Sequence, residues 1–208
     1  YAMTTPEVIS PLVTALEAAY ADMRTAHPDL PPATIVVASR GTRPVHGTFH
    51  AQRWQVEGIE KPVCEIMMAA ESLKRGAVET WGTLAHEATH ALCDARGIQE
   101  TDKSGRRHNK KFATLATEAF GLEITEARTI GWSVTAVPEA TAAANAEAIA
   151  RIEAAIMGQR CINQKAKAKS SNLLKAECDC GTIIRLSPKA LEAAPIACMA
   201  CESYFREV

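Results

Sequence analysis

Three residues in one short stretch have the types and spacing that could hold a metal ion and activate water. The stretch TLAHEATHALCDARG, residues 83–97, contains His86, Glu87 and His90. On an α-helix, residues four apart lie on one face, so both imidazoles can reach one Zn²⁺ at about 2.0–2.1 Å. A carboxylate beside the first histidine can take a proton from metal-activated water, which is the chemistry of hydrolysis. Because a pattern this short also occurs by chance, it needs a structural context.

A hydrolytic zinc site usually has three protein ligands, so the sequence must supply a third. The metzincin spacing would put a histidine at position 96 and a glycine at position 93, but the chain has Arg96 and Cys93. A thermolysin-like arrangement would use Glu118 on a later helix. The other candidate is His108, which we expect to open the next helix after a loop that can fold back. His108 is favoured over Glu118, and Cys93 is expected to pack in the core.

Four cysteines near the end of the chain form a second candidate metal site. The chain has seven cysteines, an odd number that argues against a disulfide framework. Two close pairs can complete a tetrahedral Zn²⁺ site, which would supply the folding energy that a short segment lacks. The first pair has Cys-x-Cys spacing where Cys-x2-Cys is usual, so Cys161 stays open as a substitute ligand. The four expected ligands of this structural zinc are Cys178, Cys180, Cys198 and Cys201.

Helices and strands that could position these residues follow from the hydrophobic periodicity. An apolar stripe predicts a helix over residues 77–95, which would carry both histidines of the HEATH motif. Short β-branched runs predict strands between and beside further helices. Helices are expected over 6–26, 108–120 and 138–158, and extended segments over 34–39, 48–56, 62–70 and 129–137. The pattern indicates an α+β fold.

Composition divides the chain into four parts. Residues 1–137 form the main domain, 138–158 an Ala- and Glu-rich helix, 159–176 a basic linker and 177–208 a zinc ribbon. The linker contains no acidic residue, and its lysines are candidates for nucleic-acid contact. A solvated linker explains the same charges. The three candidate contact residues are Lys165, Lys167 and Lys169.

Bulk properties exclude several classes of protein. The formal net charge is −1, and 47% of the residues are hydrophobic, as in ordinary globular proteins. No apolar run is long enough to span a bilayer, and the first residues lack a basic region followed by an apolar one. We therefore expect a cytoplasmic protein without a membrane partner.

Residues 83–122, TLAHEATHALCDARGIQETDKSGRRHNKKFATLATEAFGL, resemble the SprT-like metallopeptidase family, which includes Spartan-type proteases. The segments HGTFHAQRW and EIMMAAESL are similar to strands that precede the family's HExxH helix, so the resemblance covers roughly residues 34–135. It implies a small zincin-like α+β domain in which His86, His90 and His108 bind the catalytic zinc and Glu87 is the general base. It also implies a C-terminal zinc ribbon and a phage or bacterial source.

Two functions follow as hypotheses. The first is a zinc metalloendopeptidase acting on protein or peptide substrates; by resemblance to Spartan-type members, these could be DNA-associated or DNA-crosslinked proteins. The second is a DNA-binding or structural zinc protein whose HExxH site does not cut peptides. His46 and His50 flank a predicted strand and either line the cleft or are simply half-exposed. The candidates for stabilising an oxyanion are Arg106, Arg107 and His50.

Overall fold

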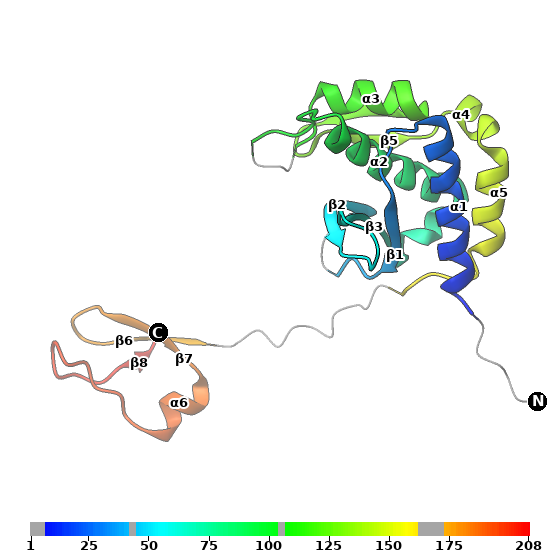
Figure 1. Ribbon diagram of the computed structural model, residues 1–208. Helices are drawn as coiled ribbons and strands as arrows, with labels where there is room; N and C mark the ends of the chain where they lie inside the picture. The colour runs from blue at the N-terminus through cyan, green and yellow to red at the C-terminus, as the bar shows by residue number, and fades with distance from the viewer. Residues whose placement is uncertain (1–6, 42–44, 104–106, 162–172) are drawn as a thin grey trace, which may run out of the picture. The chain divides into compact units, whose positions relative to one another are not determined.

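Helices and three small sheets make up the computed structural model, an α+β arrangement that describes residues 7–41, 45–103, 107–161 and 173–208 (Figure 1). The chain divides into two units, Tyr1–Cys161 and Ile162–Val208. Each unit has its own buried cluster of hydrophobic residues.

The larger sheet of the first unit has the strand order β1-β3-β2. The central strand β3 pairs in parallel with β1 and antiparallel with β2. Six of its seven residues, in the sequence VCEIMMA, are buried, as expected for a strand covered on both faces. Strand β2 is an edge, and its pairing shifts register between His50 and Trp54, where Gln52 has a φ of 51°. The strands are β1 (Ala33–Ala38), β2 (Gly47–Trp54) and β3 (Val63–Ala69).

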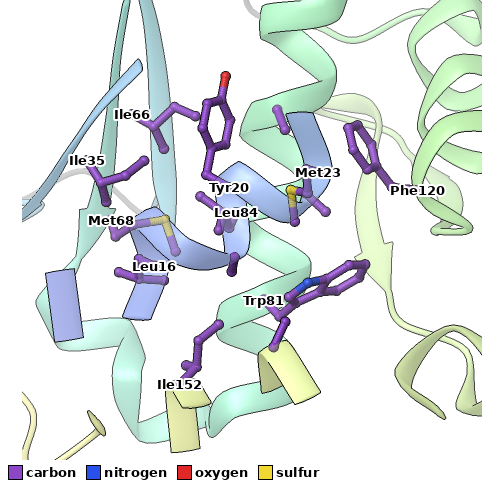
Figure 2. Packing of buried hydrophobic residues seen from close by; sticks show 14 of the residues in the cluster. Leu16, Tyr20, Met23, Ile35, Ile66, Met68, Trp81, Leu84, Phe120 and Ile152 are labelled. Carbon is purple, nitrogen blue, oxygen red and sulfur yellow. The ribbon is translucent and has the colours of Figure 1, made fainter. Parts of the chain in front are cut away.

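The helix predicted over residues 77–95 is confirmed as α2, Ala77–Ala95, the longest helix of the described residues. It follows a short 3-10 helix, η1 (Ala70–Arg75), and packs with α1 (Ser10–Ala26) on the sheet. Figure 2 shows the core that these elements share, with Leu16, Ile66 and Leu84 fully buried. Burial of this apolar area holds α2 in place, since each fully buried large aliphatic side chain contributes roughly 1.5–3 kcal/mol.

The next helix begins later than the sequence predicts. Helix α3 spans Lys110–Phe120, and Asn109 caps it by accepting hydrogen bonds from the backbone N–H groups of Lys111 and Phe112. His108 therefore lies before the helix and does not open it. A short hairpin follows, formed by β4 (Glu123–Ala127) and β5 (Gly131–Ala136). The sequence predicts only the second of these strands, because β4 has a single buried residue, Ile124.

The Ala-rich segment 138–158 forms two helices where the sequence predicts one. They are α4 (Glu139–Ala144) and α5 (Ala146–Ala155), separated by Asn145. The backbone of Asn145 has φ −113° and ψ 21°, outside the helical region, which breaks the helix there. Helix α5 packs against α1 and α2, so this segment is part of the first unit.

The second unit is a three-stranded sheet with the order β7-β6-β8 and one short helix. Its small core contains Ala176 and Phe205 together with Cys178 and Cys198. The expected start of the ribbon at residue 177 falls at the end of β6, so part of the predicted linker belongs to the sheet. The elements are β6 (Leu174–Glu177), β7 (Ile183–Leu186), α6 (Pro188–Ala193) and β8 (Arg206–Glu207).

Within the described ranges of both units, no helix combines the length and the hydrophobicity needed to cross a membrane.

Candidate metal centre

Helix α2 places the HEATH residues at the base of a cleft. His86 and His90 are one turn apart, and their ring centroids are separated by 5.2 Å. The opposite side of the helix is apolar and buried, and Leu84, Ala88 and Leu92 are each 0% exposed. The buried side turns the two imidazoles toward the cleft, because residues four apart share one face of a helix.

His108 reaches the same place through backbone bonds to the β4–β5 hairpin. Its N–H donates to the carbonyl of Ile130 at 3.2 Å, and its carbonyl accepts from the N–H of Trp132 at 3.0 Å. Gly131 lies between these two partners with a φ of 69°, and a Cβ on it would collide with the His108 carbonyl. A glycine is therefore required at this position for the hairpin to hold His108.

The three histidines converge with their side chains. One ring nitrogen of each lies within 4.8 Å of the other two, and the Nε2 atoms of His90 and His108 are 2.8 Å apart. Phe112 of α3 packs against all three imidazoles, with ring-centroid distances of 4.5–4.7 Å. This aromatic contact fixes the orientation of the rings from the side away from the cleft.

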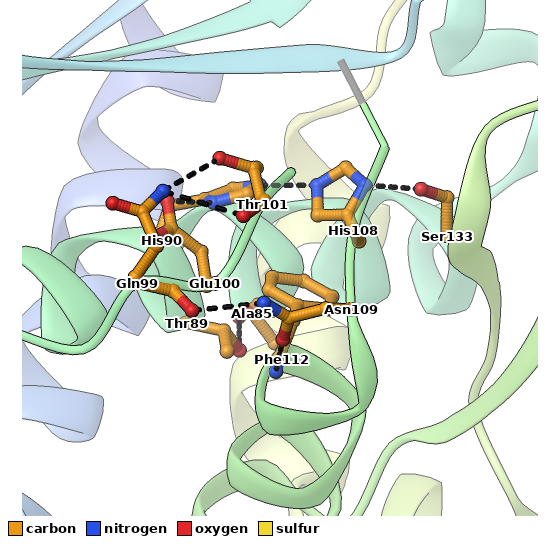
Figure 3. Close-up of polar contacts among 10 residues, drawn as sticks. All are labelled: Ala85, Thr89, His90, Gln99, Glu100, Thr101, His108, Asn109, Phe112 and Ser133. Atoms are coloured by element: carbon orange, nitrogen blue, oxygen red, sulfur yellow. Dashed lines mark hydrogen bonds and ion pairs between the residues drawn. The ribbon is translucent and has the colours of Figure 1, made fainter. Parts of the chain in front are cut away.

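The outward nitrogen of each imidazole has an oxygen partner from another element. Nδ1 of His86 is 2.7 Å from Oγ1 of Thr135, and Nδ1 of His90 is 3.4 Å from Oε1 of Glu100. Nδ1 of His108 contacts Oγ of Ser133. Figure 3 shows His108 between His90 and Ser133. The partners are a carboxylate and two hydroxyls, all able to accept a hydrogen bond.

These partners assign the tautomer of each histidine. The Ser133 hydroxyl donates to the carbonyl of Ile130, and the Thr135 hydroxyl donates to the carbonyl of Ser133. Each hydroxyl has one hydrogen, so each must accept from the imidazole beside it. The hydrogen bond from His90 lowers the pKa of Glu100, which as a carboxylate can only accept.

Each neutral ring therefore carries its proton on Nδ1 and leaves a lone pair on Nε2. Two such lone pairs, on His90 and His108, face each other at 2.8 Å. These two lone pairs repel each other unless a cation lies beside them. The donor set thus fits a metal ion held by three neutral imidazoles, with the outer oxygens fixing the tautomers.

Burial keeps two of these histidines neutral and keeps the neighbouring glutamate partly protonated. It lowers the pKa of His86 well below its usual value and that of His108 to about 4. Burial also raises the pKa of Glu87 to about 7, and the nearby imidazole of His90 would oppose this rise if it were protonated. Neutral imidazole is the form that binds a metal, and a carboxyl group with a pKa near 7 can exchange a proton at neutral pH.

A cleft of about 950 Å³ lies over the three histidines and Glu87. It follows one face of α2 from Val78 to His90 and is walled by the start of β2 and by the β5 segment. The wall on the β2 side includes Gly47 and Phe49. The histidines are thus accessible to a molecule bound in the cleft.

Several residues singled out in the sequence lie elsewhere. Glu118 is exposed on α3 and is not part of the histidine group, so the third member of that group is His108. His46 lines the cleft and contacts Ser72, whereas His50 does not line it. Arg107 also lies outside the cleft lining and pairs with Glu126 at 4.0 Å. Arg106 lies outside the described residues. Neither His50 nor Arg107 is therefore placed to stabilise an oxyanion.

Sequence reasoning missed the three oxygen partners, although one signal was available. Ser133 and Thr135 alternate along GWSVTA, and alternate residues of a strand face the same side. Two hydroxyls on one strand face could have indicated polar contacts. Glu100 lies in a polar loop, where nothing in the sequence distinguishes it from its neighbours.

The four C-terminal cysteines also gather in one place. Their Sγ atoms all lie within 4.8 Å of one another, with 3.2 Å between Cys178 and Cys180. Two turns shape the group: Gly181 donates to the carbonyl of Cys178, and Glu202 donates to that of Cys198. Cys201 completes the group, and hydrogen bonds from Ser203 lower its pKa, which favours the thiolate that binds metals. Cys161 lies in the first unit and is not a member.

The candidate nucleic-acid contacts Lys165, Lys167 and Lys169 lie outside the described residues. The described residues of the second unit, 173–208, include four basic and five acidic residues. Thiolates bound to a divalent metal would make it more negative. Its net charge therefore gives no overall attraction for a polyanion.

Comparisons of the chain with protein-family models, curated proteins and solved structures found no match in any of the three. The site geometry and the sequence motifs are therefore the features of this chain that bear on its function.

Proposed function

We propose that the chain is a zinc-dependent metalloendopeptidase with a zincin-like domain of the SprT-like kind. The observation that carries the proposal is the convergence of one ring nitrogen from each of three histidines beside the buried carboxyl group of Glu87 in an open cleft. His86, His90 and His108 would hold the zinc. Three neutral imidazoles with an open fourth position are typical of a hydrolytic zinc site.

When bound, zinc would polarise the scissile carbonyl and lower the pKa of water. Glu87 would accept a proton from the attacking water and return it to the leaving amine. Its pKa of about 7 lets it do both at neutral pH. Thr135, Glu100 and Ser133 would keep the imidazoles in the tautomer that binds the metal.

The shape of the cleft favours a polypeptide substrate. The cleft follows α2 from Val78 to His90, twelve residues further along the chain, which is about 18 Å at 1.5 Å per residue. An extended chain of that length has about five residues. A segment of an unfolded or loosely structured protein therefore fits the cleft along its length.

The test is Glu87→Gln, measured for cleavage of denatured casein and for bound zinc. We expect unchanged zinc content and a loss of activity of about 100-fold or more. The matched control is Glu79→Gln, since Glu79 is an exposed glutamate of the same cleft. A wild-type chain with zinc in the histidine site and no cleavage of casein or of any peptide in a library would overturn the proposal.

The four cysteines would hold a second, structural zinc. All four ligands come from the protein, so no position remains for a substrate. The segment needs such a staple because its core is small. We therefore expect two zinc ions per chain, and one after Cys198→Ser.

One observation favours a second function, contact with nucleic acid near the cleft. Exposed basic residues occupy the loop before α3, the first turn of α3 and the β4–β5 turn, and Lys110 lies over the ring of Trp132 at 5.7 Å. Phosphates could bind there and the cleft could then act on DNA-associated proteins. The residues are Lys103, Arg107, Lys110, Lys111 and Arg128.

Fluorescence anisotropy with single-stranded DNA tests this second function. Binding should weaken steeply with salt and should fall in Lys110→Ala/Lys111→Ala. If the double variant binds as well as wild type, these lysines are not the contact. If wild type does not bind at low salt, the DNA-linked role is wrong.

A further inference from the structure

Gly47 is the first residue of β2 and lies directly over the Glu87 side chain. A Cβ placed on it would be 2.7 Å from Oε1 and 2.8 Å from Cγ of Glu87, and 3.0 Å from Cγ2 of Thr83. Real Cβ atoms essentially never lie this close to a heavy atom outside their own chain neighbours. The space that a side chain would need at position 47 is therefore filled by Glu87.

Backbone conformation does not explain this glycine. Gly47 is not among the residues with positive φ, whereas Gly41 and Gly58, on either side of it in the sequence, have φ values of 64° and 78°. Any residue could adopt its extended backbone. Glycine is consequently required at position 47 for room and not for conformational freedom.

The neighbouring atoms are not free to move aside. Glu87 is 5% exposed and Thr83 is 8% exposed, both on the rigid helix α2. The Thr83 hydroxyl donates to the carbonyl of Glu79 at 2.9 Å, which fixes the direction of its methyl group. On the other side, β2 is held by the pairing of Gly47 with Met68 and by the bond from the Ala69 N–H to the His46 carbonyl at 2.8 Å.

The same strand makes a second contact with this carboxylate. The backbone N–H of Phe49 lowers the pKa of Glu87, opposing the effect of burial. Residues 47 and 49 are two apart, so they present equivalent backbone positions along the strand. Strand β2 thus leaves room for the Glu87 side chain at Gly47 and presents a backbone N–H to it at Phe49.

We propose that Gly47 is a positioning residue for Glu87: the gap at the start of β2 sets where the carboxylate lies relative to the three histidines. The effect on catalysis rests on the proposed metallopeptidase function, whereas the contact itself does not. The three atoms nearest to a Cβ at position 47 belong to Glu87 and Thr83, and none belongs to a proposed metal ligand or its oxygen partner. Its replacement should therefore alter the carboxylate and leave the metal bound.

The kinetic test is Gly47→Ala. A shift of the carboxylate by about 1 Å should lower kcat by about 10–100-fold, with little change in KM and unchanged zinc content. The matched control is Gly158→Ala, where the nearest atom, Cγ1 of Val8, is at an ordinary 3.8 Å. Wild-type kcat in Gly47→Ala, or an equal loss in Gly158→Ala, would overturn the proposal.

A stability cycle tests the contact without any need for activity. All three tryptophans, Trp54, Trp81 and Trp132, lie in the first unit, so tryptophan fluorescence reports the unfolding of that unit. Gly47→Ala should lower its unfolding midpoint by roughly 5 °C. In a Glu87→Ala background, which removes both Cγ and Oε1, most of this loss should disappear.

The kinetic test and the stability cycle distinguish a failure of the proposed function from a failure of the contact between Gly47 and Glu87. If wild type cuts no protein, the proposed function fails and the stability cycle still decides the contact. If Gly47→Ala does not fold alone but folds together with Glu87→Ala, the contact is supported. An equal loss of stability in both backgrounds would show that Glu87 does not occupy the space over Gly47, and the inference would be wrong.

Discussion

Oγ1 of Thr135 lies 2.7 Å from Nδ1 of His86, although the two residues are 49 positions apart in the sequence. The contact is one of three made by alternate residues of β5 and of the residue just after it, which meet the candidate metal centre and the helix that carries it. Ser133 contacts His108, Thr135 contacts His86, and Val137 lies against Gly82, one helical turn before His86. The β4–β5 hairpin therefore completes the centre that α2 begins.

Replacing Thr135 with valine should weaken zinc binding at the histidine site by about 10–100-fold. Valine has a similar shape and cannot accept the Nδ1 proton, so His86 loses the partner that fixes its tautomer. Competition with a chromophoric chelator measures the affinity. Thr125→Val, on the exposed side of the same hairpin, is the control and should bind zinc like wild type. Equal affinities in the two variants would contradict the assigned tautomer.

Replacing Gly82 with alanine should destabilise the first unit by about 1–2 kcal/mol, despite the better helix propensity of alanine. A Cβ at this position would be 2.5 Å from Cγ2 of Val137. In a Val137→Ala background the same change should become stabilising, by about 0.5–1 kcal/mol. Urea unfolding followed by tryptophan fluorescence measures both effects, and a failure of the sign to reverse would show that Gly82 and Val137 are not in this contact.

Acid should destabilise the metal-free chain through His108. Burial lowers the pKa of this histidine to about 4, whereas an unfolded histidine titrates near 6.5. Between these values the unfolded state binds more protons, so the contribution of His108 to stability falls as the pH falls from about 6.5 to 4. Glu87 has the opposite effect on stability. Because its pKa is raised in the folded state, the folded state binds a proton at a higher pH than the unfolded state does, and acid stabilises the fold through this residue.

The contribution of His108 can be separated by comparison with His108→Asn, in which Glu87 is retained. In the presence of a chelator, the variant should lose less stability than wild type between pH 7 and pH 5. Urea midpoints at the two pH values give the difference. If wild type and variant lose the same stability, His108 is not held neutral by burial.

Removal of metal should unfold the second unit and leave the hydrophobic core of the first unit folded. The second unit has few buried hydrophobic residues, so its stability depends on the cysteine site. With excess chelator, limited proteolysis should cut within 173–208, while the tryptophan fluorescence of the first unit remains native. Cys198→Ser should be cut in the same way without chelator. Cys161→Ser, outside the group, should stay resistant, and sensitivity equal to that of Cys198→Ser would argue against the four-cysteine site.

Local sequence was enough to predict the elements with strong periodicity. The apolar stripe of residues 77–95 predicted α2, and its bounds are confirmed, because the face that packs on the core repeats with the helical period. Strands β1 and β3 were predicted from compact apolar runs. Strand β4 was missed because its exposed residues outnumber the one that is buried, and the start of α3 was misplaced because Asn109 caps the helix after His108.

The sequence by itself determined the chemical groups: two histidines and a glutamate on one helix face, a third histidine nearby, and two pairs of cysteines. Only the tertiary structure decided how these groups are oriented. Ser133, Thr135 and Glu100 assign the imidazole tautomers, and Gly47 leaves room for Glu87, through contacts between segments that are distant in sequence. The spacing of residues along a chain predicts which side chains share one face of a helix or strand. It carries no information on which strand edge or hydroxyl packs against that face, since this depends on the burial of the whole core.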